Sequence, residues 1–126
     1  MKKSILLVDD CRENLENYQE LLELEGHTIL TAIDPKTAYS ISSNRLPALI
    51  VSDIKMHGMT GFELIRLIRL NNQTCHMPFI FHSAHAEPSM VKMAMQMGAL
   101  DFIVKPSCPS RLCNAVDRVL NQWPLY

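Results

Sequence analysis

Short apolar runs that end abruptly in charged residues are the feature that most limits how this chain can fold. The runs cover residues 5–8, 49–52 and 102–104. The charged side chains that follow them directly are Asp9, Asp10, Asp53 and Lys105. Such runs are typical of strands that are buried on both faces of a parallel sheet. We therefore expect the charged residues at one edge of the sheet, where the carboxyl ends of the strands meet and where open α/β folds bind ligands.

Strand-like segments alternate with longer helical stretches along the chain. Strands are expected over residues 5–8, 28–32, 48–52, 79–82 and 101–104. Asp34 before Pro35 is a helix cap followed by a first turn, and the last helix is expected to open at Pro109 and stop at Pro124. This alternation predicts right-handed crossovers and one doubly wound α/β domain over residues 1–126, with a parallel five-stranded sheet and helices on both faces.

The fourth helical stretch is unusually rich in methionine. Met90, Met93 and Met97 share a helical face with Ala94, and we expect that face to pack on the core. Met95 lies off this face and is the best candidate for an exposed contact with a partner protein, because methionine surfaces adapt to partners. Core packing is still the commoner use of a methionine.

Length and charge exclude several classes of protein. The chain has 126 residues and a formal net charge of -1, with both signs scattered along it. It is long enough to bury a core of its own and has no basic field for nucleic acid or anionic lipid. The residues Met1, Lys2 and Lys3 before an apolar run hint at a signal peptide, but Asp9 ends that run too early.

Cysteine spacing argues against a disulfide framework or a zinc site. The four cysteines lie far apart and form no CxxC pair. They are Cys11, Cys75, Cys108 and Cys113. No stretch approaches the ~20 apolar residues of a membrane span. We expect a cytoplasmic protein.

An acidic cluster beside one lysine suits a divalent cation and a phosphoryl group. A carboxylate that attacks phosphorus approaches an anion, so a cation must bridge the two. Mg²⁺, or Mn²⁺, fits because it binds through one or two carboxylates and keeps water and phosphoryl oxygens. Asp10 and Asp53 are the expected direct ligands, with Asp9 helping directly or through water. A lone aspartate after a strand is more often a helix cap, but three at one edge favour the cation site.

Five motifs together resemble the receiver domain of two-component response regulators, in the order and spacing of that family. They are Asp9-Asp10, the loop of residues 53–61, Ser83-Ala84, Phe102 and Lys105-Pro106. The resemblance spans the chain and implies the fold of the single-domain chemotaxis regulators, with strand order 2-1-3-4-5. It also suggests a cis bond between Lys105 and Pro106.

The resemblance assigns a role to each of these positions. Asp53 is the phosphoacceptor, and the backbone carbonyl of Lys55 is a further metal ligand. Lys105 and Ser83 contact phosphoryl oxygens after transfer. Ser83 and Phe102 form the switch that changes a binding surface on the fourth helix, fifth strand and fifth helix.

The same resemblance implies partners. The phosphoryl group comes from a sensor histidine kinase or a phosphotransfer protein, and the output goes to a downstream protein or to an effector domain outside this sequence. The chain catalyses its own phosphorylation and dephosphorylation and is not an enzyme that turns over a metabolite. The sequence does not decide whether the chain forms a homodimer through the fourth and fifth helices.

Some positions tune this chemistry or depart from the family pattern. Lys55 and His85 are expected to flank the route of the attacking water and so to set how long the phosphoryl group lasts. His57 stands where receivers usually have proline, so the loop after Asp53 is expected to be less rigid. Ser107 replaces a frequent aromatic residue.

Three other functions remain as alternatives. A flavin or nucleotide binder shares this fold but lacks a glycine-rich loop after the first strand, where Asp9 and Asp10 would repel a phosphate. A phosphorylation-independent interaction module would keep the site as a relic. A phosphatase with an aspartyl nucleophile needs a second acid two residues later, where this chain has Lys55.

Overall fold

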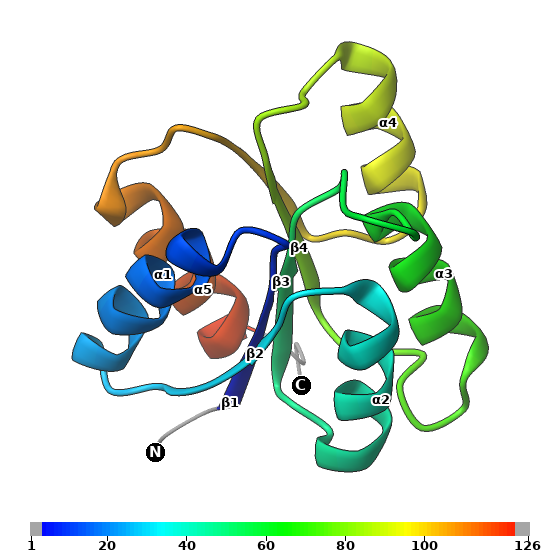
Figure 1. Ribbon diagram of the computed structural model, residues 1–126, viewed down its shortest axis with the longest axis horizontal. Coiled ribbons are helices and arrows are strands. Elements are labelled where there is room, and N and C mark those ends of the chain that lie inside the picture. The colour runs from blue at the N-terminus through cyan, green and yellow to red at the C-terminus, as the bar shows by residue number, and fades with distance from the viewer. Residues whose placement is uncertain (1–3, 123–126) are drawn as a thin grey trace.

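The computed structural model describes residues 4–122 and shows strands and helices in strict alternation (Figure 1). The strands are β1 (Ser4–Val8), β2 (Thr28–Ala32), β3 (Leu49–Ser52), β4 (Phe79–Ser83) and β5 (Asp101–Val104). The helices are α1 (Arg12–Leu24), α2 (Pro35–Arg45), α3 (Gly61–Leu70), α4 (Pro88–Gln96) and α5 (Pro109–Gln122). The expected helix stop at Pro124, and Met1, Lys2 and Lys3, lie outside the described residues.

The five strands form one parallel sheet in the order β2-β1-β3-β4-β5. This order confirms the doubly wound fold expected from the sequence. The register pairs Val8 of β1 with Ser52 of β3, and Ser83 of β4 with Val104 of β5. The ends of β1 and β3 are therefore level and those of β4 and β5 lie two residues further along, so the residues that follow these strands meet at one edge.

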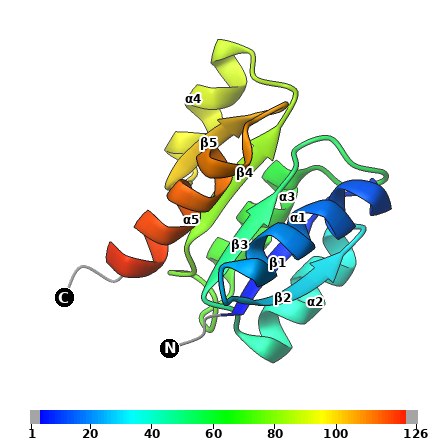
Figure 2. The same ribbon diagram turned by 90° about the vertical axis from the view of Figure 1, so that its left-hand side faces the viewer.

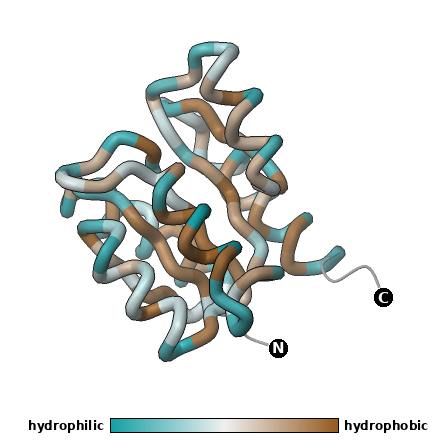
Figure 3. The backbone as a smooth tube through the Cα atoms, turned by 90° about the vertical axis from the view of Figure 1, so that its right-hand side faces the viewer, coloured by the Kyte–Doolittle hydropathy of each residue, from teal (hydrophilic) through white to brown (hydrophobic). Residues whose placement is uncertain are grey.

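Helices cover both faces of the sheet, with α1 and α5 on one side and α2, α3 and α4 on the other (Figures 1 and 2). Alternate residues of β1 and β3 pack into two separate hydrophobic cores, because successive side chains along a strand point to opposite faces of the sheet. Leu7 and Val51 pack under α1 and α5, while Leu6 and Ile50 pack under the other three helices. Hydrophobic segments accordingly run through the middle of the molecule, and polar ones lie on its outside (Figure 3).

Local capping explains where two of the helices begin. The Asp34 carboxylate accepts a hydrogen bond of 2.7 Å from the Thr37 N–H, as its place before Pro35 predicts. At α3, the Glu63 N–H donates to Thr60 Oγ1 and the Thr60 N–H donates to Glu63 Oε1, which makes a reciprocal capping box.

One expectation for α4 is wrong. Ala94 is buried and Met90 and Met97 are partly buried, but Met93 is 47% exposed, the same as Met95. Met93 is one residue from Ala94 and so lies about 100° around the helix axis. This short helix packs through a stripe too narrow to include Met93, so both methionines face outward.

Candidate functional site

The side chains of Asp9, Asp53 and Lys105 converge at the carboxyl edge of the sheet. They follow β1, β3 and β5 directly. Lys105 Nζ donates to Asp9 Oδ2 at 2.5 Å and to Asp53 Oδ2 at 3.1 Å. The three side chains are only 6%, 14% and 11% exposed, respectively, so this is a nearly buried cluster of two carboxylates and one ammonium. The strand register thus brings Lys105 into contact with Asp53, which lies 52 positions earlier in the sequence, and with Asp9, which lies 96 positions earlier, as the sequence predicted.

Backbone amides hold the other oxygen of each carboxylate. The Ile54 N–H donates to Asp53 Oδ1 at 2.6 Å, and the Cys11 N–H donates to Asp9 Oδ1 at 2.9 Å. Each acid therefore has one oxygen turned to the backbone and the other turned to Lys105. These hydrogen bonds fix the orientation of each carboxylate and leave its second oxygen facing the ammonium group of Lys105.

Lys105 keeps its charge in this setting. Burial alone would lower the pKa of its ammonium group, but the hydrogen bonds and charges of Asp9 and Asp53 outweigh burial and raise the pKa above its ordinary 10.5. The ammonium group also lies 5.7 Å from the centre of the Tyr18 ring, within range of a cation–π contact.

A buried polar layer beneath the acids was missed from the sequence. The centre of the His82 ring lies 4.8 Å from that of Tyr18, with the two rings tilted by 56°, and His82 Nε2 lies 3.2 Å from Ser107 Oγ. Burial, together with the nearby charge of Lys105, lowers the pKa of His82 to about 4, so the ring is neutral at pH 7. Strand alternation was the available signal, because it turns His82 to the face opposite Ser83.

Asp10, Lys55 and His57 form the outer rim of the site. They line an open hollow of about 220 Å³ together with Met56. Asp10 Oδ2 lies 3.0 Å from His57 Nδ1, and the Asp10 side chain is 29% exposed. Asp10 thus pairs with His57, whereas Asp9 and Asp53 pair with Lys105.

Within residues 4–122, no three His, Cys, Asp or Glu side chains are placed to hold one metal ion together. The reason is visible in the contacts: Lys105 engages Asp9 and Asp53, while Asp10 pairs with His57. The donor chemistry nevertheless fits a hard, hydrated cation, which takes one or two carboxylates and a backbone carbonyl and keeps its waters. The open hollow beside Asp10 and Lys55 has room for such waters.

Ser83 and Phe102 occupy the neighbouring strand ends. Ser83 is fully buried, and its Oγ accepts a 3.0 Å hydrogen bond from the His85 N–H. The Lys105 N–H donates to the Ser83 carbonyl at 2.9 Å, which joins the ends of β4 and β5. Phe102 is partly buried, with its ring 6.2 Å from that of Phe81. The Lys105–Pro106 bond is cis, as expected.

Gly61 allows α3 to begin directly against the acidic edge. A Cβ atom here would lie 2.2 Å from the carbonyl oxygen of Asp53 and 3.0 Å from the Phe81 ring. Its N–H donates to the Ile54 carbonyl at 2.7 Å. The site therefore depends on the glycine that ends the loop of residues 53–61.

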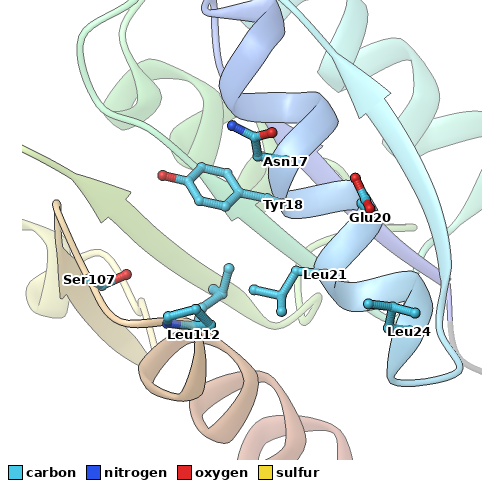
Figure 4. A pocket seen from close by; sticks show the side chains of 8 residues that line it. Asn17, Tyr18, Glu20, Leu21, Leu24, Ser107 and Leu112 are labelled. Carbon is cyan, nitrogen blue, oxygen red and sulfur yellow. The ribbon is translucent and has the colours of Figure 1, made fainter.

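A separate groove of about 330 Å³ runs between α1 and the start of α5 (Figure 4). Leu21 and Leu112 lie between the two helices, and Tyr18 projects from α1 toward the loop that carries Ser107. The groove is mostly apolar and holds none of the acidic cluster. In the described part of the chain, no helix has the length and apolarity to cross a membrane.

Comparison with known proteins identifies the family. The sequence model of the response regulator receiver domain matches residues 5–117. The phosphate regulon regulatory protein PhoB of Pseudomonas aeruginosa is 32% identical over 95% of this chain, which covers 52% of PhoB. An uncharacterized 14.6 kDa protein of Leptolyngbya boryana is 33% identical over 95% of this chain and 92% of its own length.

The chain spans about a quarter to a half of several curated relatives, such as the C4-dicarboxylate transport regulator DctD of P. aeruginosa, of which it covers 25% at 32% identity. Solved structures agree. Vibrio cholerae chemotaxis protein CheY4 superposes with a TM-score of 0.89 and 27% identity, over 94% of this chain and 99% of CheY4. A CheY-like receiver domain of Methanospirillum hungatei superposes with a TM-score of 0.89 and 27% identity, over 97% of this chain and 96% of its own. The chain therefore belongs to the response regulator receiver domains, whose general function is to accept a phosphoryl group in two-component signalling.

Proposed function

We propose that Asp53 is the phosphoacceptor and that its donor is the phosphohistidine of a sensor histidine kinase or a phosphotransfer protein. One observation carries this proposal: the Asp53 carboxylate is anchored at Oδ1 by the Ile54 N–H and faces Lys105 through Oδ2. The anchoring holds a carboxylate ready for in-line attack, and the ammonium group offsets the repulsion between carboxylate and phosphoryl group.

The transfer needs no further reactant. An oxygen of Asp53 forms a bond to phosphorus while the phosphorus–nitrogen bond of the phosphohistidine breaks, and the leaving imidazole keeps the electron pair and takes up a proton. In hydrolysis, water attacks phosphorus and the bond to Asp53 breaks, which regenerates the carboxylate and releases inorganic phosphate. The chain thus modifies only itself and turns over no metabolite.

The proposed cation ligands are Asp10 and Asp53, with Asp9 and the backbone carbonyl of Lys55 as further oxygens. When bound there, Mg²⁺ or Mn²⁺ supplies positive charge between the carboxylates and the phosphoryl oxygens. Asp53 would hold the ion through Oδ2, the oxygen that faces Lys105 in this structure. The ammonium group of Lys105 is then available to hold a phosphoryl oxygen, and the Ser83 hydroxyl holds another.

The switch in this proposal is the pair Ser83 and Phe102. The Ser83 hydroxyl already accepts one hydrogen bond in a fully buried position, so reorienting it toward a phosphoryl group requires its loop to move. Phe102, which is partly buried and packs against the core, would follow it. Because Phe102 carries no hydroxyl, its inward position would be stabilised by packing alone.

The proposed output surface lies on α4, β5 and α5. Its apolar side chains include Met93, Met95 and Val104, which are 47%, 47% and 51% exposed, respectively. A downstream protein or an effector domain outside this sequence would bind there. Lys55, which is exposed, and His85, next to Ser83, remain the predicted tuning residues.

We also propose that residues 1–126 form one receiver domain in the cytoplasm. The four cysteines are free thiols, and two of them, Cys11 and Cys108, are exposed. Unpaired exposed thiols are the usual state in a reducing compartment.

Intact-mass measurement after incubation with acetyl phosphate tests the phosphoacceptor. We expect the wild type to gain the mass of one phosphoryl group only when Mg²⁺ is present, and Asp53→Asn to gain none. Asp34→Asn is the matched control, because it removes a carboxylate outside the site and keeps a capping side chain. If folded wild-type protein stays unmodified beside a working receiver, the phosphoacceptor is refuted and a phosphorylation-independent interaction module is favoured.

A further inference from the structure

His57 and Asp10 meet at the solvent side of the proposed cation site. The His57 Nδ1 atom lies 3.0 Å from Asp10 Oδ2, and the imidazole is 97% exposed. Both side chains line the hollow of about 220 Å³ that Lys55 also lines. An exposed ring held against a carboxylate at an open hollow leaves the outer side of both groups accessible to an ion.

The backbone fixes the position from which the imidazole reaches Asp10. The Met59 N–H donates to the His57 carbonyl at 3.1 Å, and Gly58 adopts a φ of 84°, which favours glycine. The capping box of Thr60 begins α3 directly afterwards. His57 therefore sits in a tight turn between β3 and α3, close to Asp10 at the end of β1.

The distance between the two ligand atoms suits a shared ion. Two ligands that bind one ion at right angles, each with a bond of ~2.0–2.1 Å, lie roughly 3.0 Å apart. This is the separation of His57 Nδ1 and Asp10 Oδ2. An ion could therefore engage both atoms at this separation if it displaced the proton of their hydrogen bond to solvent and the imidazole turned its Nδ1 lone pair toward the ion.

We propose that His57 is an additional ligand of the cation site and gives this receiver a preference for nitrogen-binding divalent ions such as Ni²⁺, Co²⁺ and Zn²⁺. The inference rests on the proposed cation site around Asp10. Imidazole binds these ions well, whereas Mg²⁺ prefers carboxylate, carbonyl and water oxygens. Losing His57 is therefore expected to weaken Ni²⁺ binding strongly and Mg²⁺ binding little.

Calorimetric titration with Ni²⁺ and Mg²⁺ tests this on the wild type and on His57→Ala. The fold should tolerate this change, because the side chain is almost fully exposed. We expect the Ni²⁺ affinity to fall by at least about tenfold, since losing even an outer-shell partner costs 10–100-fold. The Mg²⁺ affinity should change by less than about threefold. His76→Ala is the matched control, because His76 is an exposed histidine just before β4, at the opposite edge of the sheet.

Three results would overturn the proposal in distinguishable ways. Equal Ni²⁺ affinities of the wild type and His57→Ala would make His57 a hydrogen-bond partner of Asp10 only. An equal loss in His76→Ala would mean adventitious binding by surface histidines. If Asp10→Asn binds Mg²⁺ and Ni²⁺ as tightly as the wild type, the cation site itself is wrong. As a second readout, pulsed EPR of the Mn²⁺-loaded protein should show a coupled imidazole nitrogen that disappears in His57→Ala.

Discussion

Lys105→Met removes the ammonium group between Asp9 and Asp53 and keeps an apolar stem of similar length. Two charged hydrogen bonds, at 2.5 and 3.1 Å, are lost, and each is worth about 1.5–3 kcal/mol. The variant no longer has to desolvate a lysine, which offsets part of this loss. Since removing one partner of a buried ion pair costs about 3–5 kcal/mol and these side chains keep slight exposure, we expect the free energy of unfolding to fall by about 3 kcal/mol.

Urea unfolding at pH 7 in the presence of EDTA measures this loss. Saturating Mg²⁺ should reduce the difference in the free energy of unfolding between the wild type and Lys105→Met, because a cation bound by Asp53 replaces the missing charge. Binding at a concentration of 100 times Kd adds about 2.7 kcal/mol to the free energy of unfolding, and the variant should bind Mg²⁺ more tightly than the wild type. Lys92→Met, a change at an exposed position of α4, is the control and should stay within about 0.5 kcal/mol of the wild type.

The pH dependence of this gap has a definite sign. The pKa of Lys105 is raised in the folded protein above its ordinary 10.5. Its stabilising contribution is therefore fully present below pH 10.5 and is lost as the pH rises through the folded-state value. A variant as stable as the wild type without Mg²⁺, or a gap that Mg²⁺ leaves unchanged, would refute the idea that Lys105 balances the two carboxylates.

Three further changes test the packing around the site. Gly61→Ala places a Cβ atom 2.2 Å from the Asp53 carbonyl, so α3 must shift; we expect about 2 kcal/mol less stability in urea unfolding and slower phosphorylation by acetyl phosphate. For His82→Gln, lowering the pH from 7 to 5 should reduce the free energy of unfolding of the wild type by about 2 kcal/mol more than that of the variant. The reason is that the wild-type ring has a pKa of about 4 when folded and 6.5 when unfolded. Thr60→Ala removes half of the capping box and should cost about 1 kcal/mol in thermal unfolding.

The sign for His82 follows from proton binding. Between pH 6.5 and 4 the unfolded chain binds a proton at this position and the folded chain does not, so acidification favours unfolding. A difference between the wild type and His82→Gln that is independent of pH would refute a neutral buried imidazole. For Gly61→Ala, unchanged stability and unchanged phosphorylation would mean that α3 does not depend on the close approach.

The sequence alone was sufficient for the order of the elements and for the edge at which the site forms. Apolar runs and helix caps act over a few residues, so strand ends such as Val8 and Ser52 could be located without tertiary information. Parallel pairing then brings the following residues together, which is why Asp9, Asp53 and Lys105 were expected to be neighbours and are.

Tertiary structure decided which of these groups touch and which way they face. Lys105 engages Asp9 and Asp53, whereas Asp10 turns to His57, because these pairs join residues far apart in the chain through particular side-chain orientations. The buried contact between His82 and Ser107, and the exposure of Met93, likewise depend on how helices sit over the sheet. Periodicity identifies a helical face but does not determine how much of it a neighbouring element covers.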